Sequence, residues 1–201
     1  MSDNRDDVEI ISHETVCQSY FRLDKYRLRH RTFAGGWSGE VVREVFERGQ
    51  AVAVLLYDPD RDEVALIEQF RVGAHAAGWN PWLVEVVAGI IEDGEHPDDV
   101  ARREVKEEAG CECLDLVPMM HAILSPGAVS ETCKIYCGRV DCSSIGGLHG
   151  LADEDEDIRV FTLPADEAIA MVKDGRVNNS VAIMALLWLA LEKDGLRKRW
   201  R

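Results

Sequence analysis

The sequence predicts a mixed α+β domain that follows a strand-rich segment. Two patterns favour this class: apolar runs of strand length between turn residues, and segments of helix length that begin at capping residues. The composition agrees, because 46% apolar and 30% charged residues are ordinary for a globular protein. A chain of 201 residues can bury roughly 70% of its unfolded surface, so it needs no disulfides to form a core.

The strand-rich segment comes first in the chain. Its strands are expected at Val8–Ile11, Tyr20–His30 and Glu40–Phe46. A segment of about forty residues cannot enclose a core, so it must lie against the rest of the chain or against a partner subunit. We therefore divide the chain into an N-terminal segment, residues 1–48, and a larger domain, residues 49–201.

The larger domain is expected to open with a β-hairpin. Its strands are Ala51–Tyr57 and Val64–Ile67, and the Asp- and Pro-rich residues 58–62 form the turn. After a loop, Trp82–Ile91 reads as one continuous apolar strand. Glu85 is the one charge in that run, and a lone carboxylate there is unusual.

A helix is predicted from Pro97 to Glu108 or Ala109. Proline suits the first helical position, and Asp98 and Asp99 in the first turn meet the positive end of the helix dipole. Gly110 is placed to cap the helix. The remaining elements are strands at Met119–Leu124, Lys134–Val140 and Ile158–Leu163, and helices at Ala165–Lys173 and Ser180–Glu192.

Charge and composition limit the partners. There are 23 Lys and Arg against 37 Asp and Glu, which gives a formal net charge of −14 and argues against nucleic-acid and anionic-membrane partners. Residues 1–7 have no apolar stretch, so they do not resemble a signal peptide. The six cysteines form no C-x-x-C pair, and we expect reduced thiols in a cytoplasmic protein.

Three glutamates share one face of the predicted helix 97–109. Glu104, Glu107 and Glu108 stand at positions i, i+3 and i+4. Two such charges about 4 Å apart repel by on the order of 4 kcal/mol at an effective dielectric constant of about 20. Oxygen ligands without soft neighbours point to Mg²⁺ or Mn²⁺. The alternative is a solvated face that is neutralised by Arg102, Arg103 and Lys106.

The wider pattern favours the metal site. Residues 89–111 read GIIEDGEHPDDVARREVKEEAGC and fit G-x5-E-x7-R-E-U-x-E-E-x-G-U, where U is an apolar residue. The fixed positions are Gly89, Glu95, Arg103, Glu104, Glu107, Glu108 and Gly110. Cys111, at the last U, is smaller than usual and affects packing rather than chemistry. This is the signature of the Nudix hydrolases, which the chain resembles.

The resemblance covers nearly the whole chain and is to the bacterial ADP-ribose pyrophosphatase branch of that family. Pro126, in Ser125-Pro126-Gly127, matches the proline that marks the branch. The resemblance implies an α/β/α sandwich around a mixed β-sheet. It also implies Mg²⁺-dependent hydrolysis of ADP-ribose to AMP and ribose 5-phosphate, with Mn²⁺ as a substitute.

The resemblance also implies roles at the metal site. Glu104, Glu108 and the carbonyl of Ala88 are expected to bind metal, and Glu107 is expected to support or share it. Arg103 and Glu95 are expected to brace the signature through a salt bridge.

The general base is sought in the acidic run 153–157, which follows three glycines. In an extended chain Glu154 and Glu156 point to the same side. The resemblance implies that Glu154 is the base and Glu156 a metal ligand. Two alternatives remain: His149 is the base, or the run is an ordinary solvated loop.

Substrate contacts are implied in two sets. One subunit is expected to supply Arg71, Ile90, Ser125, Pro126, Gly127 and Glu131. The partner subunit of an intertwined homodimer is expected to supply Tyr20, Phe21, Arg43, Glu44 and Arg48. Chemistry supports part of this, because arginine clamps phosphate in a bidentate manner and an aromatic face accepts adenine. Alternatively, Arg71 is merely exposed at a strand end and the aromatics are buried in the N-terminal sheet.

Three other functions are alternatives. The signature recognises metal and phosphate, so a nucleotide sugar or a dinucleotide is an alternative substrate. A non-catalytic Nudix-fold sensor has no need of every metal-site carboxylate. A calcium-binding loop at residues 153–157 lacks the D-x-D-x-D-G-x5-E spacing. We therefore expect the excess acids near the site to surround metal ions, so that a diphosphate binds only when divalent metal is present.

Overall fold

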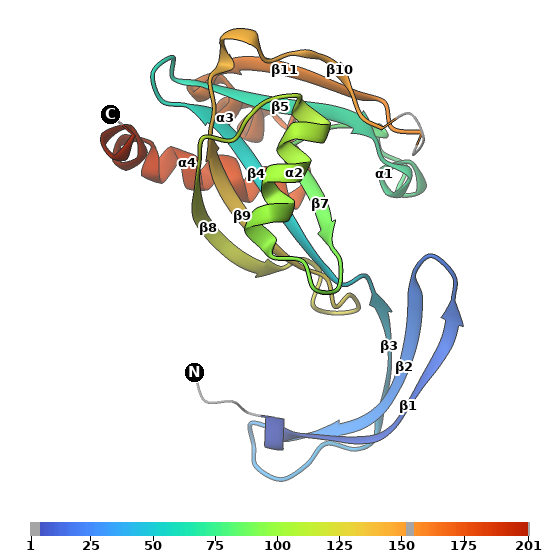
Figure 1. Cartoon of the computed structure of the whole chain (residues 1–201). Helices are drawn as coiled ribbons and strands as arrows, with labels where there is room; N and C mark the ends of the chain where they lie inside the picture. Colours follow the sequence, from blue (N-terminus) through green and yellow to red (C-terminus); the bar gives the residue numbers. More distant parts are fainter. Residues whose placement is uncertain (1–4, 152–154, 201) are drawn as a thin grey trace. The chain divides into compact units, whose positions relative to one another are not determined.

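The computed structural model describes residues 5–151 and 155–200. The chain forms two compact units (Figure 1). The first contains Met1–Gly49 and Ile123–Glu131, and the second contains Gln50–Ala122 and Thr132–Arg201. A loop of the larger domain therefore belongs to the N-terminal unit, and the predicted boundary after residue 48 stays a prediction.

The N-terminal unit is a three-stranded antiparallel sheet. After a 3-10 turn at Arg5–Asp7, the strands are β1 (Val8–Gln18), β2 (Arg22–His30) and β3 (Val41–Glu47), in the order β1-β2-β3. β1 is longer than predicted because polar residues after Ile11 continue to pair with β2. Tyr20 and Phe21 lie in the turn before β2 and not in the strand, since Ser19 N–H donates to Phe21 O at 2.9 Å.

This sheet has almost no buried side chains. In β1, β2 and β3 as described, Asp24 is the one buried residue. Its carboxylate accepts a hydrogen bond from Thr15 Oγ1 at 2.9 Å and lies 2.8 Å from His13 Nε2 and 3.0 Å from Arg22 Nε. A polar cluster therefore stands where an apolar core would be, as expected for a segment that is too short to enclose one.

The second unit is built on an eight-stranded mixed sheet. Its main path runs β10-β11-β5-β4-β9-β8. β4 and β9 are parallel, whereas β4 and β5 are antiparallel. The strands are β4 (Gln50–Asp58), β5 (Glu63–Phe70), β6 (Trp82–Glu85), β7 (Val87–Ile91), β8 (Asp115–Ile123), β9 (Thr132–Arg139), β10 (Gly147–His149) and β11 (Ile158–Pro164).

The prediction of one strand over residues 82–91 is wrong. The run divides at Val86: β6 pairs with β5, and β7 pairs with β4. Because the chain changes partner, Glu85 lies opposite Ile67 and Ala88 lies opposite Ala53. The division brings two parts of the later site to neighbouring strands.

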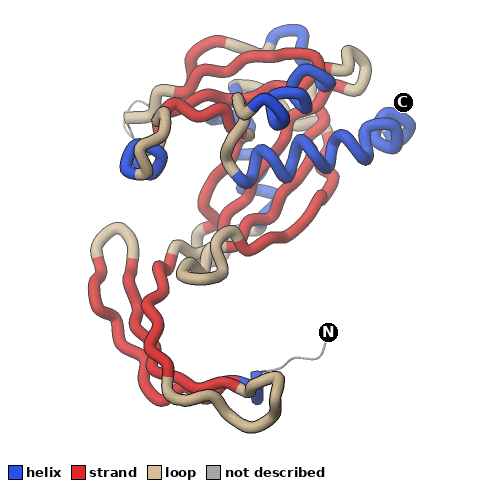
Figure 2. The backbone as a smooth tube through the Cα atoms, turned by 180° about the vertical axis from the view of Figure 1, so that it is seen from behind, coloured by secondary structure: helices blue, strands red, loops and turns tan. Residues whose placement is uncertain are grey.

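Helices cover both faces of this sheet. Val52, Val54 and Leu56 of β4 pack in one apolar cluster with Val105 of α2 (Pro97–Ala109). On the other face lie α3 (Ala165–Asp174) and α4 (Ser180–Arg199), and Tyr57 is 6.4 Å from Trp200 between ring centroids. The view from behind shows α4 across that face (Figure 2). The predicted α/β/α sandwich is confirmed.

Two helices differ from expectation. The short α1 (Val72–Ala76) was not predicted, because five residues carry no readable periodicity. α4 continues past Glu192, since Leu196 is buried and three basic residues suit the helix C-terminus. Among the described helices, none is long and apolar enough to cross a membrane.

All six cysteines are free. Burial raises the pKa of Cys142 to about 12 and the pKa values of Cys111 and Cys113 to about 11. A thiol with so high a pKa stays protonated at neutral pH and is a poor nucleophile. These three side chains therefore act as small apolar groups in the core.

Asp58 ties the β4–β5 turn to the rest of the domain. It is 3% exposed, and its carboxylate accepts from the N–H groups of Asp60, Arg61 and Cys142 at 2.9, 3.0 and 2.9 Å. Asp58→Ala is expected to lower the free energy of unfolding by about 3 kcal/mol, because three N–H groups lose their acceptor. Urea denaturation measures this.

The matched control is Asp60→Ala in the same turn. Its carboxylate is largely exposed and makes one ion pair, with Arg139 at 3.6 Å. Its removal is expected to change stability by less than about 0.5 kcal/mol. Equal decreases in the free energy of unfolding of the two variants would show that the Asp58 hydrogen bonds do not stabilise the turn.

Candidate active site

Local signals place α2 as predicted. Pro97 is its first residue, and Gly110 caps it with φ +62°. The ring of His96 accepts a hydrogen bond from Asp98 N–H, and Asp98 Oδ1 accepts one from Tyr136 O–H of β9 at 2.9 Å. The helix is thus anchored to the sheet at its first turn, which fixes the face that carries the glutamates.

Glu108 is a buried carboxylate on that face. It is 4% exposed, and its Oε2 accepts a hydrogen bond from Ala88 N–H of β7 at 3.0 Å. Burial, with the negative charges of Glu104 and Glu156, raises its pKa to about 8, although Ala88 and Arg71 oppose the shift. A cation in contact with this carboxylate would favour its ionised form.

Glu104 packs against the same strand. Its carboxylate lies so close to Gly89 that a Cβ atom on residue 89 would overlap it. Glycine at this position therefore lets the carboxylate reach the main chain of β7. The structure brings Glu104 and Glu108 against neighbouring residues of β7, and the role of Ala88, Glu104 and Glu108 as metal ligands stays a prediction.

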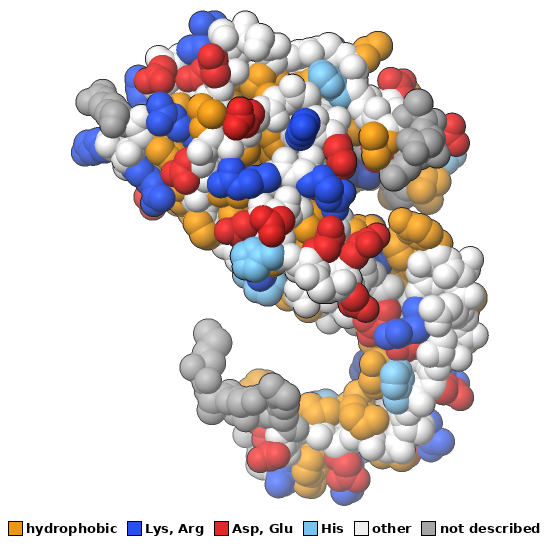
Figure 3. Space-filling view, in the orientation of Figure 1, with side chains coloured by type: hydrophobic (Ala, Val, Ile, Leu, Met, Phe, Trp, Pro, Cys, Tyr) orange, Lys and Arg blue, Asp and Glu red, His pale blue; other side chains and the backbone are white. Residues whose placement is uncertain are grey.

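Arg103 is the cation next to these acids. Its guanidinium nitrogens lie 2.9 Å from Glu104 Oε1, 3.2 Å from Glu107 Oε2 and 3.7 Å from Glu95 Oε1. The Arg103–Glu95 ion pair is the brace that the signature implies. Glu107 faces Arg103 at the edge of the group and is more exposed than Glu104, 32% against 12%. Acidic and basic side chains intermingle over this face (Figure 3).

The donors suit a hard divalent cation. All are oxygen atoms, and a cation would offset the burial and the negative charges of Glu104 and Glu156 that raise the pKa of Glu108. Within the described part of the chain, no three His, Cys, Asp or Glu side chains already converge as a metal centre. Glu104 and Glu107 are instead paired with Arg103.

The structure describes residues 155–157 of the acidic segment and the loop before it as far as Leu151. Glu154, the expected base, lies outside the described residues. Glu156 N–H donates to Leu151 O, and Leu151 N–H donates to Glu156 Oε2, both at 3.2 Å. The charge of Glu156 also acts on Arg71 and Glu108. Glu156 is thus in the neighbourhood of Glu108, with one oxygen bonded to the flank of its own loop.

His149, the alternative base, packs at the C-terminal cap of α2. Its ring would overlap a Cβ atom on Gly110, and its Nε2 is 3.1 Å from Gly146 O. These contacts give His149 a role in anchoring β10 to the helix. They do not require a role in proton transfer.

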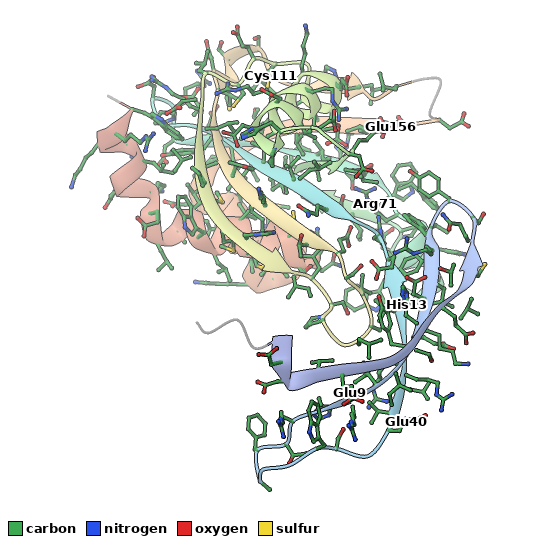
Figure 4. All side chains as sticks on the ribbon, turned by 60° about the horizontal axis from the view of Figure 1, so that its bottom comes forward. Glu9, His13, Glu40, Arg71, Cys111 and Glu156 are labelled. Atoms are coloured by element: carbon green, nitrogen blue, oxygen red, sulfur yellow. The ribbon has the colours of Figure 1, made fainter. Side chains whose placement is uncertain are left out.

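Arg71 and Ile90 are placed by neighbouring strands. Arg71 follows β5 (Figure 4). Its Nη2 lies 2.7 Å from Glu85 Oε2. Ile90 is on β7, opposite Ala51, and is 39% exposed. The sequence reasoning missed Glu85 as a functional candidate, and the available signal was its charge inside an apolar run.

The other substrate candidates lie in the N-terminal unit. The guanidinium of Arg48 is over the ring of Phe21 at 4.7 Å, and its Nε is 3.5 Å from Glu131 Oε1. One chain thus joins residues that were expected from two subunits, and their division between subunits stays a prediction. Tyr20 is 82% exposed and stacks edge-on against Phe21 at 4.7 Å.

The remaining candidates border this group. Arg43 and Glu44 are on β3, opposite Tyr26 and Lys25. Residues 125–127 form a turn, in which Ser125 O accepts from Ala128 and Val129 N–H. That turn is tied to β3 because Phe46 N–H donates to Ala128 O at 2.8 Å.

Known proteins resemble this chain over almost all of its length. A NUDIX domain model matches residues 47–185. The chain is 48% identical over 196 residues to the ADP-ribose pyrophosphatase of Escherichia coli K12, covering 98% of this chain and 94% of that one. Identity to the ADP-ribose pyrophosphatase of Haemophilus influenzae is 39% over 201 residues, covering 98% and 93%.

Two further similarities are more distant. The chain is 35% identical over 185 residues to the GDP-mannose pyrophosphatase of Yersinia enterocolitica, with coverage of 89% and 93%. A crystal structure of an ADP compounds hydrolase superimposes with a TM-score of 0.73 at 22% identity, covering 94% of this chain and 96% of that one. The latter supports the fold.

Proposed function

The chain belongs to the Nudix family, and from this premise we propose that it hydrolyses the pyrophosphate bond of ADP-ribose to give AMP and ribose 5-phosphate. One observation carries the chemistry: the buried Glu108 lies beside Glu104 against the main chain of β7. The similarity to ADP-ribose pyrophosphatases carries the choice of substrate. The activity requires a divalent cation, for which we propose Mg²⁺, with Mn²⁺ as a substitute.

The reaction is the attack of water on one phosphorus of the diphosphate. A bond forms from the water oxygen to phosphorus, the bond to the bridging oxygen breaks, and the water loses a proton. When bound, the cation lowers the pKa of the water and neutralises charge on the phosphate oxygens. The residues that would hold the cation are the Ala88 carbonyl, Glu104, Glu108 and Glu156, with Glu107 in support.

The chain's own residues supply the other steps. Glu154 is proposed to accept the proton of the attacking water, and Arg71 to hold the diphosphate. The further substrate contacts are proposed on the resemblance, namely Tyr20, Phe21, Arg43, Glu44, Arg48, Ile90, Ser125, Pro126, Gly127 and Glu131. We also propose a cytoplasmic enzyme, since six free cysteines suit a reducing compartment.

We propose that the enzyme is a homodimer. The N-terminal sheet has no apolar core, and Val8, Ile10 and Val16 of β1 are 46%, 50% and 52% exposed. A second copy of the sheet is proposed to cover these side chains. Light scattering on purified protein should give about twice the 22.5 kDa chain mass. A monomer mass at micromolar concentration would refute the dimer and leave the activity open.

Product analysis tests the proposed activity. Purified protein with ADP-ribose and Mg²⁺ should release AMP and ribose 5-phosphate in equal amounts, and excess EDTA should stop the release. The second candidate is a GDP-sugar, which the similarity to GDP-mannose pyrophosphatase favours. GMP release without AMP release would select it.

Gly89→Ala tests the metal assignment without touching a ligand. The added methyl group would displace the Glu104 carboxylate. We expect the Mg²⁺ concentration for half-maximal activity to rise about 10- to 100-fold, the range for groups that orient a metal ligand. Gly195→Ala in α4 is the control, since a Cβ there meets only Glu192 Oε2 at 3.7 Å. An unchanged requirement in a folded Gly89→Ala protein would remove Glu104 from the metal site.

A further inference from the structure

Glu85 makes an unusual set of contacts at the end of β6. Its side chain is 13% exposed. One oxygen, Oε2, accepts from Gln69 Nε2 at 3.2 Å and from Arg71 Nε and Nη2 at 3.0 and 2.7 Å. Gln69 is itself only 7% exposed. A single carboxylate oxygen thus accepts from two side chains, Gln69 near the end of β5 and Arg71 just beyond it.

Three backbone contacts fix the positions of Glu85 and its partners. Ile67 of β5 pairs with Glu85, so Gln69 and Arg71 continue on the same side of the chain at a period of two. Arg71 N–H donates to Pro81 O at 2.8 Å, which fixes the arginine backbone. Asn179 Nδ2 donates to Val84 O at 2.7 Å. Asn179 Oδ1 caps α4 by accepting from Ala182 N–H at 3.0 Å.

The guanidinium held in this way is close to the catalytic carboxylates. Glu85 is its nearest charge, and Glu108 and Glu156 also act on it. Without Glu85, the attraction of Glu108 and Glu156 would draw Arg71 toward the place where cation and phosphate are proposed to bind. The two bonds from Nε and Nη2 use one edge of a planar group with five N–H donors. Glu85 does not use the other donors, which can bind an anion.

We propose that Glu85 is the positioning residue that orients Arg71 for the diphosphate of the substrate. This inference rests on the proposed function, in which Arg71 holds the diphosphate. Gln69 completes the arrangement by holding the shared oxygen from the other side. Glu85 itself does not touch the reacting atoms in this role and acts through Arg71.

The test is a double-mutant cycle on the full-length protein. Glu85→Gln keeps the size of the side chain and removes its charge. It should lower kcat/KM about 10- to 100-fold, mainly through a higher KM, because bonds to charged groups are worth that much. Glu85→Asp, which keeps the charge, should recover part of the loss. In an Arg71→Ala background, Glu85→Gln should change kcat/KM less than about twofold.

Two controls separate positioning from general damage. Glu63→Gln removes a similar partner, since Glu63 lies 2.8 Å from Arg61 at the far end of β5, and it should leave the kinetics unchanged. The thermal midpoint of Glu85→Gln should stay within about 4 °C of the parent. Wild-type kinetics in Glu85→Gln, or losses that multiply in the double variant, would overturn the inference.

The same experiment distinguishes failure of the proposed ADP-ribose activity from failure of the proposed positioning role of Glu85. The parent protein is assayed first on ADP-ribose and GDP-mannose, and the cycle is run on the better substrate. Failure of the parent on ADP-ribose counts against the proposed function alone. Independent effects of Glu85 and Arg71 on the better substrate count against the positioning role alone.

Discussion

Glu108→Gln is expected to lower kcat/KM about 10³-fold at fixed Mg²⁺, because several kcal/mol of charge stabilisation depend on the cation that this carboxylate binds. Glutamine keeps the shape and an oxygen for the Ala88 N–H, so the fold should survive. The metal-free variant should unfold no more easily than the parent, because burial beside Glu104 already disfavours the ionised form of Glu108 and glutamine is neutral. Mn²⁺ titration by electron paramagnetic resonance should show weaker binding.

The control for this change is Glu112→Gln. Glu112 is exposed and lies four residues further along the chain, just beyond the helix cap. The Glu112→Gln variant should retain the kcat/KM and the Mn²⁺ affinity of the parent. If Glu108→Gln instead bound Mn²⁺ as the parent does, Glu108 would be a structural residue and the metal ligands would have to be sought elsewhere.

Glu154→Gln is expected to lower kcat by roughly 10² to 10⁴, the range for loss of a general base. Cation binding should stay nearly intact, because the proposed ligands Glu104 and Glu108 are unchanged. The same electron paramagnetic resonance titration separates these two effects. The pH dependence of kcat should also lose its acidic limb in the variant.

Asp155→Asn provides the comparison for Glu154. Asp155 is the next residue, is exposed, and has φ +55°, a conformation that asparagine tolerates well. Its kcat should remain near the parental value. Similar losses in both variants would mean that the segment acts by its overall charge, and a normal kcat in Glu154→Gln would place the base at another residue.

Local patterns were enough to predict the helix and the face that its glutamates share, whereas their role as metal ligands stays a prediction. The cap residues Pro97 and Gly110 are read within one turn of each helix end, and α2 has the predicted bounds. The spacing of Glu104 and Glu108 likewise follows from helix geometry. The brace between Arg103 and Glu95 required the family signature, because it joins the helix to the loop before it.

Contacts between segments that are distant in the sequence could not be predicted from its patterns. Apart from Glu85 the run 82–91 is apolar, so its pattern does not show that the chain changes strand partner at Val86. The bond between Ala88 and Glu108 spans 20 residues, and that between Arg71 and Glu85 spans 14. Such pairings depend on strand register, which a single sequence does not display.

The central claim is that this site hydrolyses ADP-ribose with a divalent cation, and the most direct test compares two substrates. Values of kcat/KM for ADP-ribose and GDP-mannose should be measured on the same purified protein at the same Mg²⁺ concentration. We predict AMP and ribose 5-phosphate as products and a kcat/KM at least about tenfold higher for ADP-ribose, a difference of about 1.4 kcal/mol in transition-state binding. A higher kcat/KM for GDP-mannose, or hydrolysis of ADP-ribose that persists in excess EDTA, would contradict it.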